Sequence, residues 1–588
     1  MTQHRTNRNQ SEDFTMRKIG YVFLFVAILM GIDAFAKQAK VEKAKDTRLI
    51  YLQAMKEEMQ RTMKDLSLKD FPQIYFVSYS IKFVESYEIG ARFGNLYAIR
   101  DDKFGVADVD VRVGSYEYDH TSDKGVEFEF SWSPSDYRSS NIVPLEPDIS
   151  AVRNVLWLLS DSTYKANAAG YLKKKGKAIY EVEDKDKKDC FSREDKVSYY
   201  GEQENLVFDI KKVSEIAKRL SSIFIEYPEI FDSDIRLRAE KVTHIFVNSE
   251  GTEIIMDKVY YSFVANAFSR SEDGMLLTND KSVYSTTLEK FPDENRLSNE
   301  VKDLIAELLA LRKAPLFEPY TGPAILEPEA TGVLFHEAIG HRLEGDRMND
   351  QSEGQTFKDK IGQQILPTFI SVYDDPTMKE FQDIPINGYY EFDDQGVKAQ
   401  KVTLIDKGVL KNYLMSRKPV KGFNKSNGHG RAGVYGKPMS RMAVTYVKAA
   451  DTVPFSELKK MLIEEVKKQG KPYGLMIKNI KGGSTNTSSF GYQAFNGIPR
   501  SVYRVYPDGR EELVRGVEMV GTPLVTISKI IKASNEYGVF NGYCGAESGY
   551  VPVAAVAPYV LISEIELQST MKFKERPLIL PSPWSRHK

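Results

Sequence analysis

The sequence EPEATGVLFHEAIGH, residues 327–341, is the one conspicuous helical segment in a half of the chain that is otherwise rich in strands and turns. Pro328 suits the first position of a helix, where its missing N–H group would have no partner anyway. The segment holds two of the seven histidines, and Glu337 directly follows the first of them, His336. We therefore expect a strand-rich domain built around one chemically active helix.

The spacing of His336 and His341 does not suit a regular helix. Zinc helices usually carry histidines four residues apart, about 40° around the axis, whereas a spacing of five separates them by about 140°. A local π-type widening brings residues five apart onto one face. Gly340 also lets the helix unwind beside His341. We predict a distorted helix end at Gly340 that directs both imidazoles at one metal ion.

A catalytic zinc site needs a third protein ligand and an open position. Cys544 is the best candidate because it lies in the glycine-rich sequence NGYCG, residues 541–545, and zinc favours thiolate ligands. The alternative is that Cys544 is a small buried apolar residue. Glu337 is adjacent to a ligand and can accept a proton from water.

The rest of the chain predicts an α+β protein with two domains. Mixed helical and strand patterns fill the first half, and hairpins dominate the second. We place a mixed α/β domain at residues 37–315, a β-rich domain at 316–570 and a flexible tail at 571–588. The expected helices are 47–66, 148–169, 213–224 and 299–311, and the expected strands include 74–84, 106–113, 244–247, 253–256, 399–405, 501–506 and 559–567.

The first 36 residues have the features of a signal peptide. Arg17 and Lys18 precede an apolar run over 19–32, which is followed by Ala34-Phe35-Ala36. The run is shorter than the ~20 residues of a spanning helix. We expect cleavage after Ala36, a periplasmic or secreted mature protein and no stable membrane span. A retained anchor is the alternative.

The composition argues against nucleic-acid binding and against a scaffold built on disulfides. The chain has 81 Lys and Arg against 82 Asp and Glu, a net charge of -1, so it lacks the basic field of nucleic-acid-binding proteins. Cys190 and Cys544 are the only cysteines, too few for a disulfide-built scaffold. A bond between these two thiols would abolish the predicted metal site.

Four motifs resemble the TldD/PmbA family of metallopeptidases, specifically its metal-bearing TldD-type members. The motifs are EPEATGVLFHEAIGHRLEGD at 327–346, GHGR at 428–431, Gly482-Gly483 and Cys544-Gly545. The resemblance implies that His336, His341 and Cys544 bind zinc and that Glu337 is the general base. It also implies an N-terminal α/β domain, a C-terminal domain of antiparallel sheets in a barrel-like arrangement, and dimers that enclose a cavity for unfolded or extended peptides.

Those dimers could be homodimers or heterodimers with a metal-free PmbA-type partner. The chain departs from typical members in its export signal and its longer first half. The family's segment after the metal cysteine usually has a Gly-Gln pair, and here that segment reads Cys544-Gly545-Ala546-Glu547-Ser548-Gly549. Met442-Ala443-Val444-Thr445 replaces Met-Thr-Asn-Thr. We expect both segments to contact substrate.

Two further pairs of residues have a functional and a structural interpretation. His429 and Arg431 are predicted to bind substrate, and the alternative is a glycine-flanked turn. Glu344 and Asp346 could orient an imidazole ring, and the alternative is a solvated helix end.

The sequence thus predicts an exported, zinc-dependent peptidase that acts on unfolded or extended peptides. Two alternatives remain open. One is a non-catalytic binding or assembly protein braced by a metal. The other is a zinc hydrolase of a non-peptide amide, such as a cell-wall cross-link.

Overall fold

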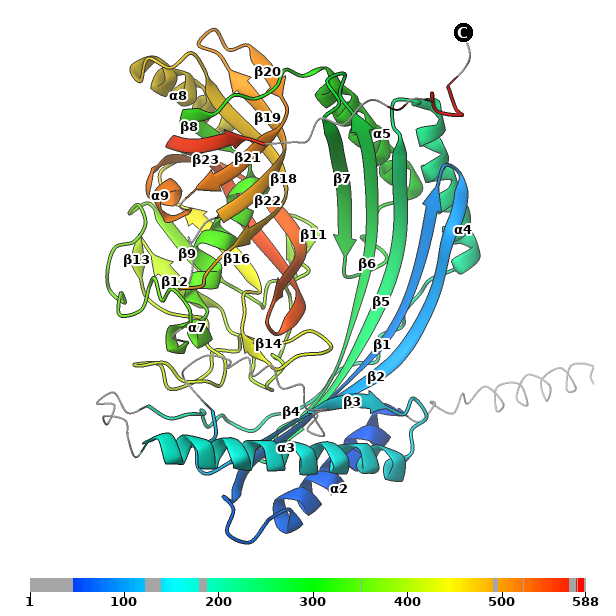
Figure 1. Ribbon diagram of the computed structural model, residues 1–588, viewed down its shortest axis with the longest axis vertical. Helices are drawn as coiled ribbons and strands as arrows, with labels where there is room; N and C mark the ends of the chain where they lie inside the picture. The colour runs from blue at the N-terminus through cyan, green and yellow to red at the C-terminus, as the bar shows by residue number, and fades with distance from the viewer. Residues whose placement is uncertain are drawn as a thin grey trace, which may run out of the picture.

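The structure is a computed structural model that describes residues 46–121, 139–178, 188–350, 352–489, 495–521, 523–570, 578 and 580–585. The predicted signal peptide and most of the predicted tail lie outside these residues. Figure 1 shows a strongly curved sheet from the N-terminal half of the chain beside a second, β-rich body from the C-terminal half.

The first sheet is built from long antiparallel hairpins. Its order is β3-β2-β1-β5-β6-β4, and β7 pairs with β6. Only the short β4 pairs in parallel, with β6. The strands are β1 (Ile74–Arg92), β2 (Asn95–Val113), β3 (Ser140–Val143), β4 (Ser198–Tyr200), β5 (Asp232–Asn248), β6 (Glu253–Arg270) and β7 (Leu276–Ser285).

Four helices cover one face of this sheet. They are α2 (Arg48–Asp65), α3 (Ile149–Ala178), α4 (Ile210–Ser222), which a short 3-10 turn η1 (Ile223–Glu226) follows, and α5 (Glu294–Lys313). Val77 and Ile81 of β1 join the core with α2 and α3, and Ile89 and Ala91 join the core with α4 and α5. These positions are odd-numbered, so they share a face. Lys82 lies on the opposite face and donates to the Ala432 and Gly433 carbonyls of the second body.

The second sheet has 12 strands and closes on itself in part. Its order is β13-β12-β9-β16-β23-β21-β19-β18-β8, and β8 also pairs with β23. The strands β8, β18, β19, β21 and β23 therefore form a closed ring. The bounds are β8 (Tyr320–Leu326), β9 (Ile370–Asp374), β12 (Val402–Asp406), β13 (Val409–Leu410), β16 (Val444–Ala449), β17 (Thr452–Val453), β18 (Gly474–Thr485), β19 (Phe495–Val505), β20 (Glu511–Val514), β21 (Val517–Gly521), β22 (Ile530–Ala546) and β23 (Gly549–Ser569).

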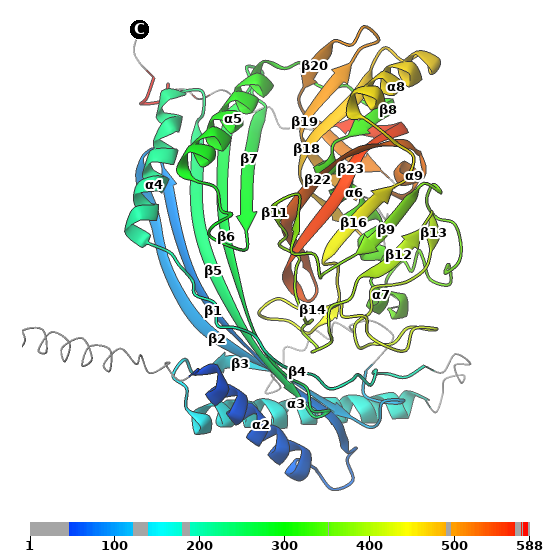
Figure 2. The same cartoon turned by 180° about the vertical axis from the view of Figure 1, so that it is seen from behind.

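The histidine segment lies inside this second body. It comprises α6 (Pro328–Phe335), a π turn η2 (His336–Gly340) and a 3-10 turn η3 (His341–Leu343). Figure 2 shows α6 among β16, β22 and β23. The remaining elements are α7 (Gly345–Asn349), α8 (Phe455–Lys468), α9 (Pro523–Ser528) and the short strand pairs β10 (Glu380–Phe381) with β11 (Ile384–Pro385) and β14 (Gly430–Arg431) with β15 (Met439–Ser440).

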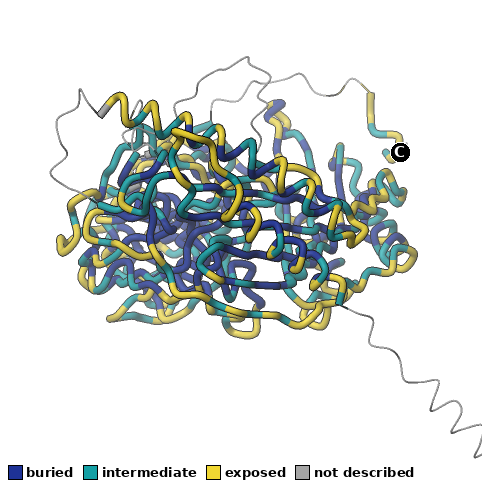
Figure 3. Tube along the Cα trace, turned by 90° about the horizontal axis from the view of Figure 1, so that it is seen from below, coloured by how far each residue is buried: buried dark blue, intermediate teal, exposed yellow. Residues whose placement is uncertain are grey.

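The fold class is confirmed as α+β, with a ring-like arrangement of strands near the histidine helix. Helix α8 was not predicted from the sequence, although Leu458, Leu462 and Val466 recur every four residues and pack against Ile325 and Leu561. Figure 3 shows that the buried residues are concentrated in the interior of the molecule. Within the described part of the chain, no helix is long and apolar enough to cross a membrane.

Candidate metal centre

The histidine helix is distorted as the spacing predicts. Glu327 precedes the helix, Pro328 opens it, and regular α-helix ends at Phe335. A five-residue π turn then spans His336 to Gly340, and a 3-10 turn starts at His341. The widened turn brings the two imidazole rings together, with centroids 5.1 Å apart and planes at 87°. The predicted distortion is confirmed.

Gly340 is required for a different reason from the one expected. Its φ of -55° is ordinary for any residue. A Cβ at this position would lie 1.8 Å from Met442 Sδ. The helix end therefore needs glycine because the Met442 side chain packs directly against the backbone there.

Cys544 completes a three-ligand cluster from a distant strand. It lies on β22 opposite Val551 of β23, and its Sγ is 3.4 Å from His341 Nε2. The ligand atoms of His336, His341 and Cys544 all lie within 4.8 Å of one another, and all three residues are buried. Zinc bonds of about 2.0–2.3 Å place tetrahedral ligand atoms roughly 3.3 to 3.8 Å apart. The cluster therefore fits a metal ion after small side-chain movements.

The surroundings of Cys544 favour the thiolate, the form that binds metals. Burial raises the pKa of this thiol, but the charge and hydrogen bonding of His336 and His341 outweigh burial and lower the pKa to about 4. No disulfide joins Cys544 and Cys190, which are both described, and Cys190 lies elsewhere, where its N–H donates to the Tyr116 carbonyl.

Glu337 lies beside the three candidate ligands. It is 7% exposed, lines the same cavity, and places Oε2 3.9 Å from His341 Nε2. Burial raises the pKa of this carboxyl group. A carboxylate with a raised pKa at this position is suited to accept and return a proton.

Glu344 holds the second nitrogen of the His341 ring. Its Oε1 lies 3.2 Å from His341 Nδ1, and its Oε2 accepts a 2.7 Å hydrogen bond from Arg347. Burial opposes ionisation of Glu344, but the charges of His341 and Arg347 lower its pKa to about 2. Glu344 thus takes the orienting position predicted for it. Asp346 does not, since its Oδ2 accepts from Ser416 Oγ and Ser440 N.

Arg441 links the helix to the cysteine strand, a role that was not predicted from the sequence. Its guanidinium donates to the Cys544 carbonyl at 2.8 Å and to Ser548 Oγ at 2.7 Å. Its Nε lies 3.6 Å from Glu344 Oε1. Arg441 is fully buried. Only the fold brings this arginine to the site, because about a hundred residues separate it from the histidine helix and from Cys544.

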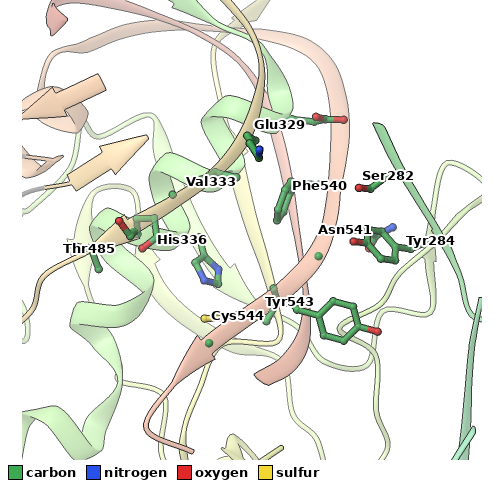
Figure 4. Close-up of a pocket in the computed structure, with 18 of the residues that line it drawn as sticks. Ser282, Tyr284, Glu329, Val333, His336, Thr485, Phe540, Asn541, Tyr543 and Cys544 are labelled. Carbon is green, nitrogen blue, oxygen red and sulfur yellow. The ribbon is translucent and has the colours of Figure 1, made fainter. Parts of the chain in front are cut away.

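The cluster opens into a cavity of about 700 Å³ between the two bodies (Figure 4). Its walls come from β7, α6, β18 and β22. Gly482 and Gly483 of the predicted glycine pair line it, as do Gly545, Ala546 and Glu547 after the cysteine. The residues Met442 to Thr445 do not line this cavity. Ala443 and Val444 instead donate their N–H groups to the buried Asp374.

The structure does not bring His429 and Arg431 to this cavity. His429 is fully buried, with Nδ1 3.0 Å from the Asn427 carbonyl and Nε2 3.2 Å from Asp374 Oδ1. Arg431 donates to the carbonyls of Met442 and Pro552. This geometry favours the structural interpretation, and substrate binding by these two residues stays a prediction.

Comparisons with known proteins agree with this geometry. The family profile described as the PmbA/TldA metallopeptidase C-terminal domain matches residues 319–569. Metalloprotease MJ0996 of Methanocaldococcus jannaschii is 27% identical over 60% of this chain and 71% of its own length. A metalloprotease of Archaeoglobus fulgidus is 32% identical over 40% of this chain and 51% of its own length. The zinc metalloprotease TldD homolog of Saccharolobus solfataricus is 24% identical over 61% of this chain and 76% of its own length.

Solved structures share the fold. A Thermotoga maritima protein aligns with a TM-score of 0.61 and 15% identity over 88% of this chain and 99% of its own. TldE from Thermococcus kodakarensis aligns with a TM-score of 0.57 and 12% identity over 88% of this chain and 100% of its own.

The curved sheet, the strand ring and a three-ligand cluster with an adjacent glutamate define a class of metalloprotease. Residues 319–569 match the C-terminal domain of that class, the chain is similar to metalloproteases named as TldD homologues, and His336, His341 and Cys544 form its candidate metal site.

Proposed function

We propose that this protein is a zinc-dependent peptidase that hydrolyses unfolded or extended peptides outside the cytoplasm. The observation that carries the proposal is that His336, His341, Cys544 and Glu337 all line one cavity of about 700 Å³. A closed structural metal site has no such open side and no need of a neighbouring base. The non-catalytic alternative is therefore disfavoured.

Zinc is the metal that best suits the cluster. Two imidazoles and one thiolate form a ligand set that zinc favours, and a relative is named as a zinc metalloprotease. When bound, zinc supplies Lewis acidity that polarises a carbonyl group and makes a water molecule more acidic.

The protein's own residues supply proton transfer and orientation. Glu337 accepts the proton of the attacking water and returns it to the departing amine. Glu344 fixes the orientation of the His341 ring, and Arg347 and Arg441 hold Glu344. The Glu337 backbone is also fixed, because Arg342 donates a 2.8 Å hydrogen bond to its carbonyl.

Two strand edges in the cavity suit an extended substrate. Among the strands that the structure describes, β7 pairs with β6 alone, and residues 280 and 282–284 line the cavity. Residues 481–485 of β18 also line it, beyond the segment that pairs with β8. A peptide paired with such an edge gains affinity from backbone hydrogen bonds with little demand on sequence. A folded protein would not fit in this space.

Export and oligomer formation are further parts of the proposal. The basic and apolar sequence over residues 17–32 supports export, with cleavage after Ala36. The family resemblance supports a homodimer or a heterodimer with a metal-free PmbA-type partner. Cell fractionation and native mass of the secreted or periplasmic protein test both points.

The substrate class is tested with three substrates: an unstructured peptide library, the same sequences in a folded protein and cross-linked cell-wall fragments. We expect cleavage of the unstructured peptides alone, and its loss in Glu337→Gln. Glu327→Gln is the matched control, because Glu327 lies on the same helix segment but does not line the cavity. Cleavage of the cell-wall fragments alone would contradict a peptidase and favour a non-peptide amidase.

A further inference from the structure

A second carboxylate of the histidine helix lines the cavity at a defined distance from the metal ligands. Glu329 precedes His336 by seven residues, and Val333 lies between them on the same wall (Figure 4). Seven residues of α-helix turn through about 700°, so the two side chains are only about 20° apart around the axis. They are separated by about 10.5 Å along it.

Glu329 has no hydrogen-bond or ion-pair partner among the residues that the structure describes. Two other acidic side chains of the cavity wall have cationic partners: Asp280 accepts a 2.6 Å bond from Arg500, and Glu547 accepts from Arg347. The third, Glu337, lies beside the candidate metal ligands. Arg500 and Lys281 are the cations near Glu329, and Lys281 is paired with Glu307. Burial raises the pKa of Glu329, since these neighbouring cations only partly offset it. The cavity therefore contains a carboxyl group without a dedicated cation, and a bound cation would favour its charged form.

We propose that Glu329 binds a cationic amine of the substrate, about three residues on the N-terminal side of the cleaved bond. The proposal rests on the proposed peptidase function. An extended chain advances about 3.4 Å per residue, so about three residues span the 10.5 Å between Glu329 and the metal ligands. The amine is either the peptide's own N-terminal ammonium or a lysine side chain at that position. The first source makes the protein an exopeptidase that releases short N-terminal fragments.

Glu329 has one competing role, which is purely structural. A glutamate in the first turn of a helix stabilises that helix through its dipole. That role changes the melting temperature when Glu329 is replaced, but it does not change the preference between substrates. The test therefore compares substrates.

The first arm uses wild-type protein and matched unstructured octapeptides. One set has a free N-terminus, a second has an acetylated N-terminus, and a third is acetylated with lysine at the third position before the cleaved bond. If the bound amine is the N-terminal ammonium, the peptides with a free N-terminus should have a kcat/KM about 10- to 100-fold above the acetylated, lysine-free set. If it is a lysine side chain, the acetylated lysine peptides should show that increase. Mass spectrometry should show N-terminal fragments of about three residues if the N-terminal ammonium is the source.

The second arm measures binding without turnover. Fluorescently labelled peptides of the three sets are titrated into Glu337→Gln, alone and combined with Glu329→Gln or with the control Glu327→Gln. Glu329→Gln should raise the Kd of the cationic peptides about 10- to 100-fold and leave the acetylated, lysine-free peptides unchanged. Glu327→Gln should change neither Kd.

The two arms separate this inference from the proposed function. Equal cleavage and equal binding of all three sets by the protein with Glu329 intact would overturn the Glu329 assignment while leaving the peptidase in place. A lack of cleavage of every peptide, with the binding preference retained, would contradict the peptidase and support the amine site.

Discussion

Two buried clusters in the second body each combine histidine with a carboxylate but have different surroundings. At His336 and His341, the cluster has Cys544 and Glu337 beside it and faces a cavity. At His429, both ring nitrogens have partners, and the acceptor Asp374 is itself saturated by the N–H groups of Ala443 and Val444. One cluster has an open side and ligand atoms that face one another, whereas the ring nitrogens of the other both have partners in the core.

The difference shows that burial and a carboxylate partner do not by themselves make a histidine functional. A satisfied network in a core fixes the fold. A cluster of donor atoms that face one another, with a base beside them and space in front, is arranged for a metal and a substrate. The predictions below perturb the open cluster, the satisfied cluster or the helix segment that holds the two metal-binding histidines.

The largest expected effect is loss of metal from the open cluster. His336→Ala and Cys544→Ala remove one of three ligands, so bound metal should fall from about one ion per chain to nearly none. Peptide hydrolysis should fall with it. Metal analysis by mass spectrometry checks this result, with His429→Ala as the reference. Retention of a full metal complement by both ligand variants would show that the metal lies elsewhere.

Replacement of Glu344 should have an effect of intermediate size on metal binding. Glu344→Gln keeps the size of the side chain but weakens its hold on the His341 ring, so metal affinity should fall by about 10- to 100-fold. Competition with a zinc chelator measures the affinity. Asp346→Asn is the matched control, because its carboxylate accepts from Ser416 and Ser440 and does not face the imidazole. Equal losses in the two variants would argue for a general loosening of the helix end.

A substitution in the satisfied cluster should lower the stability of the protein and leave metal binding and catalysis unchanged. His429→Ala leaves the Asp374 network incomplete and a void in the core, so the free energy of unfolding should fall by about 2 to 4 kcal/mol. Urea unfolding measures this loss, and metal content and KM should stay at their wild-type values. A raised KM with unchanged stability would instead establish the predicted role of His429 in substrate binding.

The smallest effect concerns Glu327, a carboxylate of the same helix segment that has no imidazole partner. Burial raises its pKa to about 7. The folded protein therefore binds this proton more tightly than the unfolded chain, and the associated stability is lost as pH rises from about 4.5 through 7. Between pH 5 and pH 8, wild type should lose about 1 to 3 kcal/mol relative to Glu327→Gln. Parallel pH profiles of unfolding for the two proteins would contradict this.

The sequence predicted the parts of this molecule that depend on local pattern. Helical periodicity identified α2, α3 and α5, and the five-residue spacing of His336 and His341 predicted the π turn. Residue chemistry identified Cys544 as the third ligand candidate across two hundred positions, and the family resemblance strengthened that prediction.

The parts that were missed depend on contacts between distant segments. Arg441 reaches Glu344 and Cys544 only because β22 and the histidine helix pack together. The reason for Gly340 is the side chain of Met442, which no local pattern reveals. Whether His429 is satisfied or open likewise depends on Asp374, 55 residues away in the chain.

Metal content and peptide hydrolysis, measured on the same preparations of wild type and Glu337→Gln, test the central claim most directly. The account predicts about one zinc ion per chain in both proteins and a fall in kcat of about 10²- to 10⁴-fold in the variant. Full activity of Glu337→Gln with its zinc retained would contradict the assignment of Glu337 as the base. Activity of a wild-type protein free of any metal would contradict the metal centre itself.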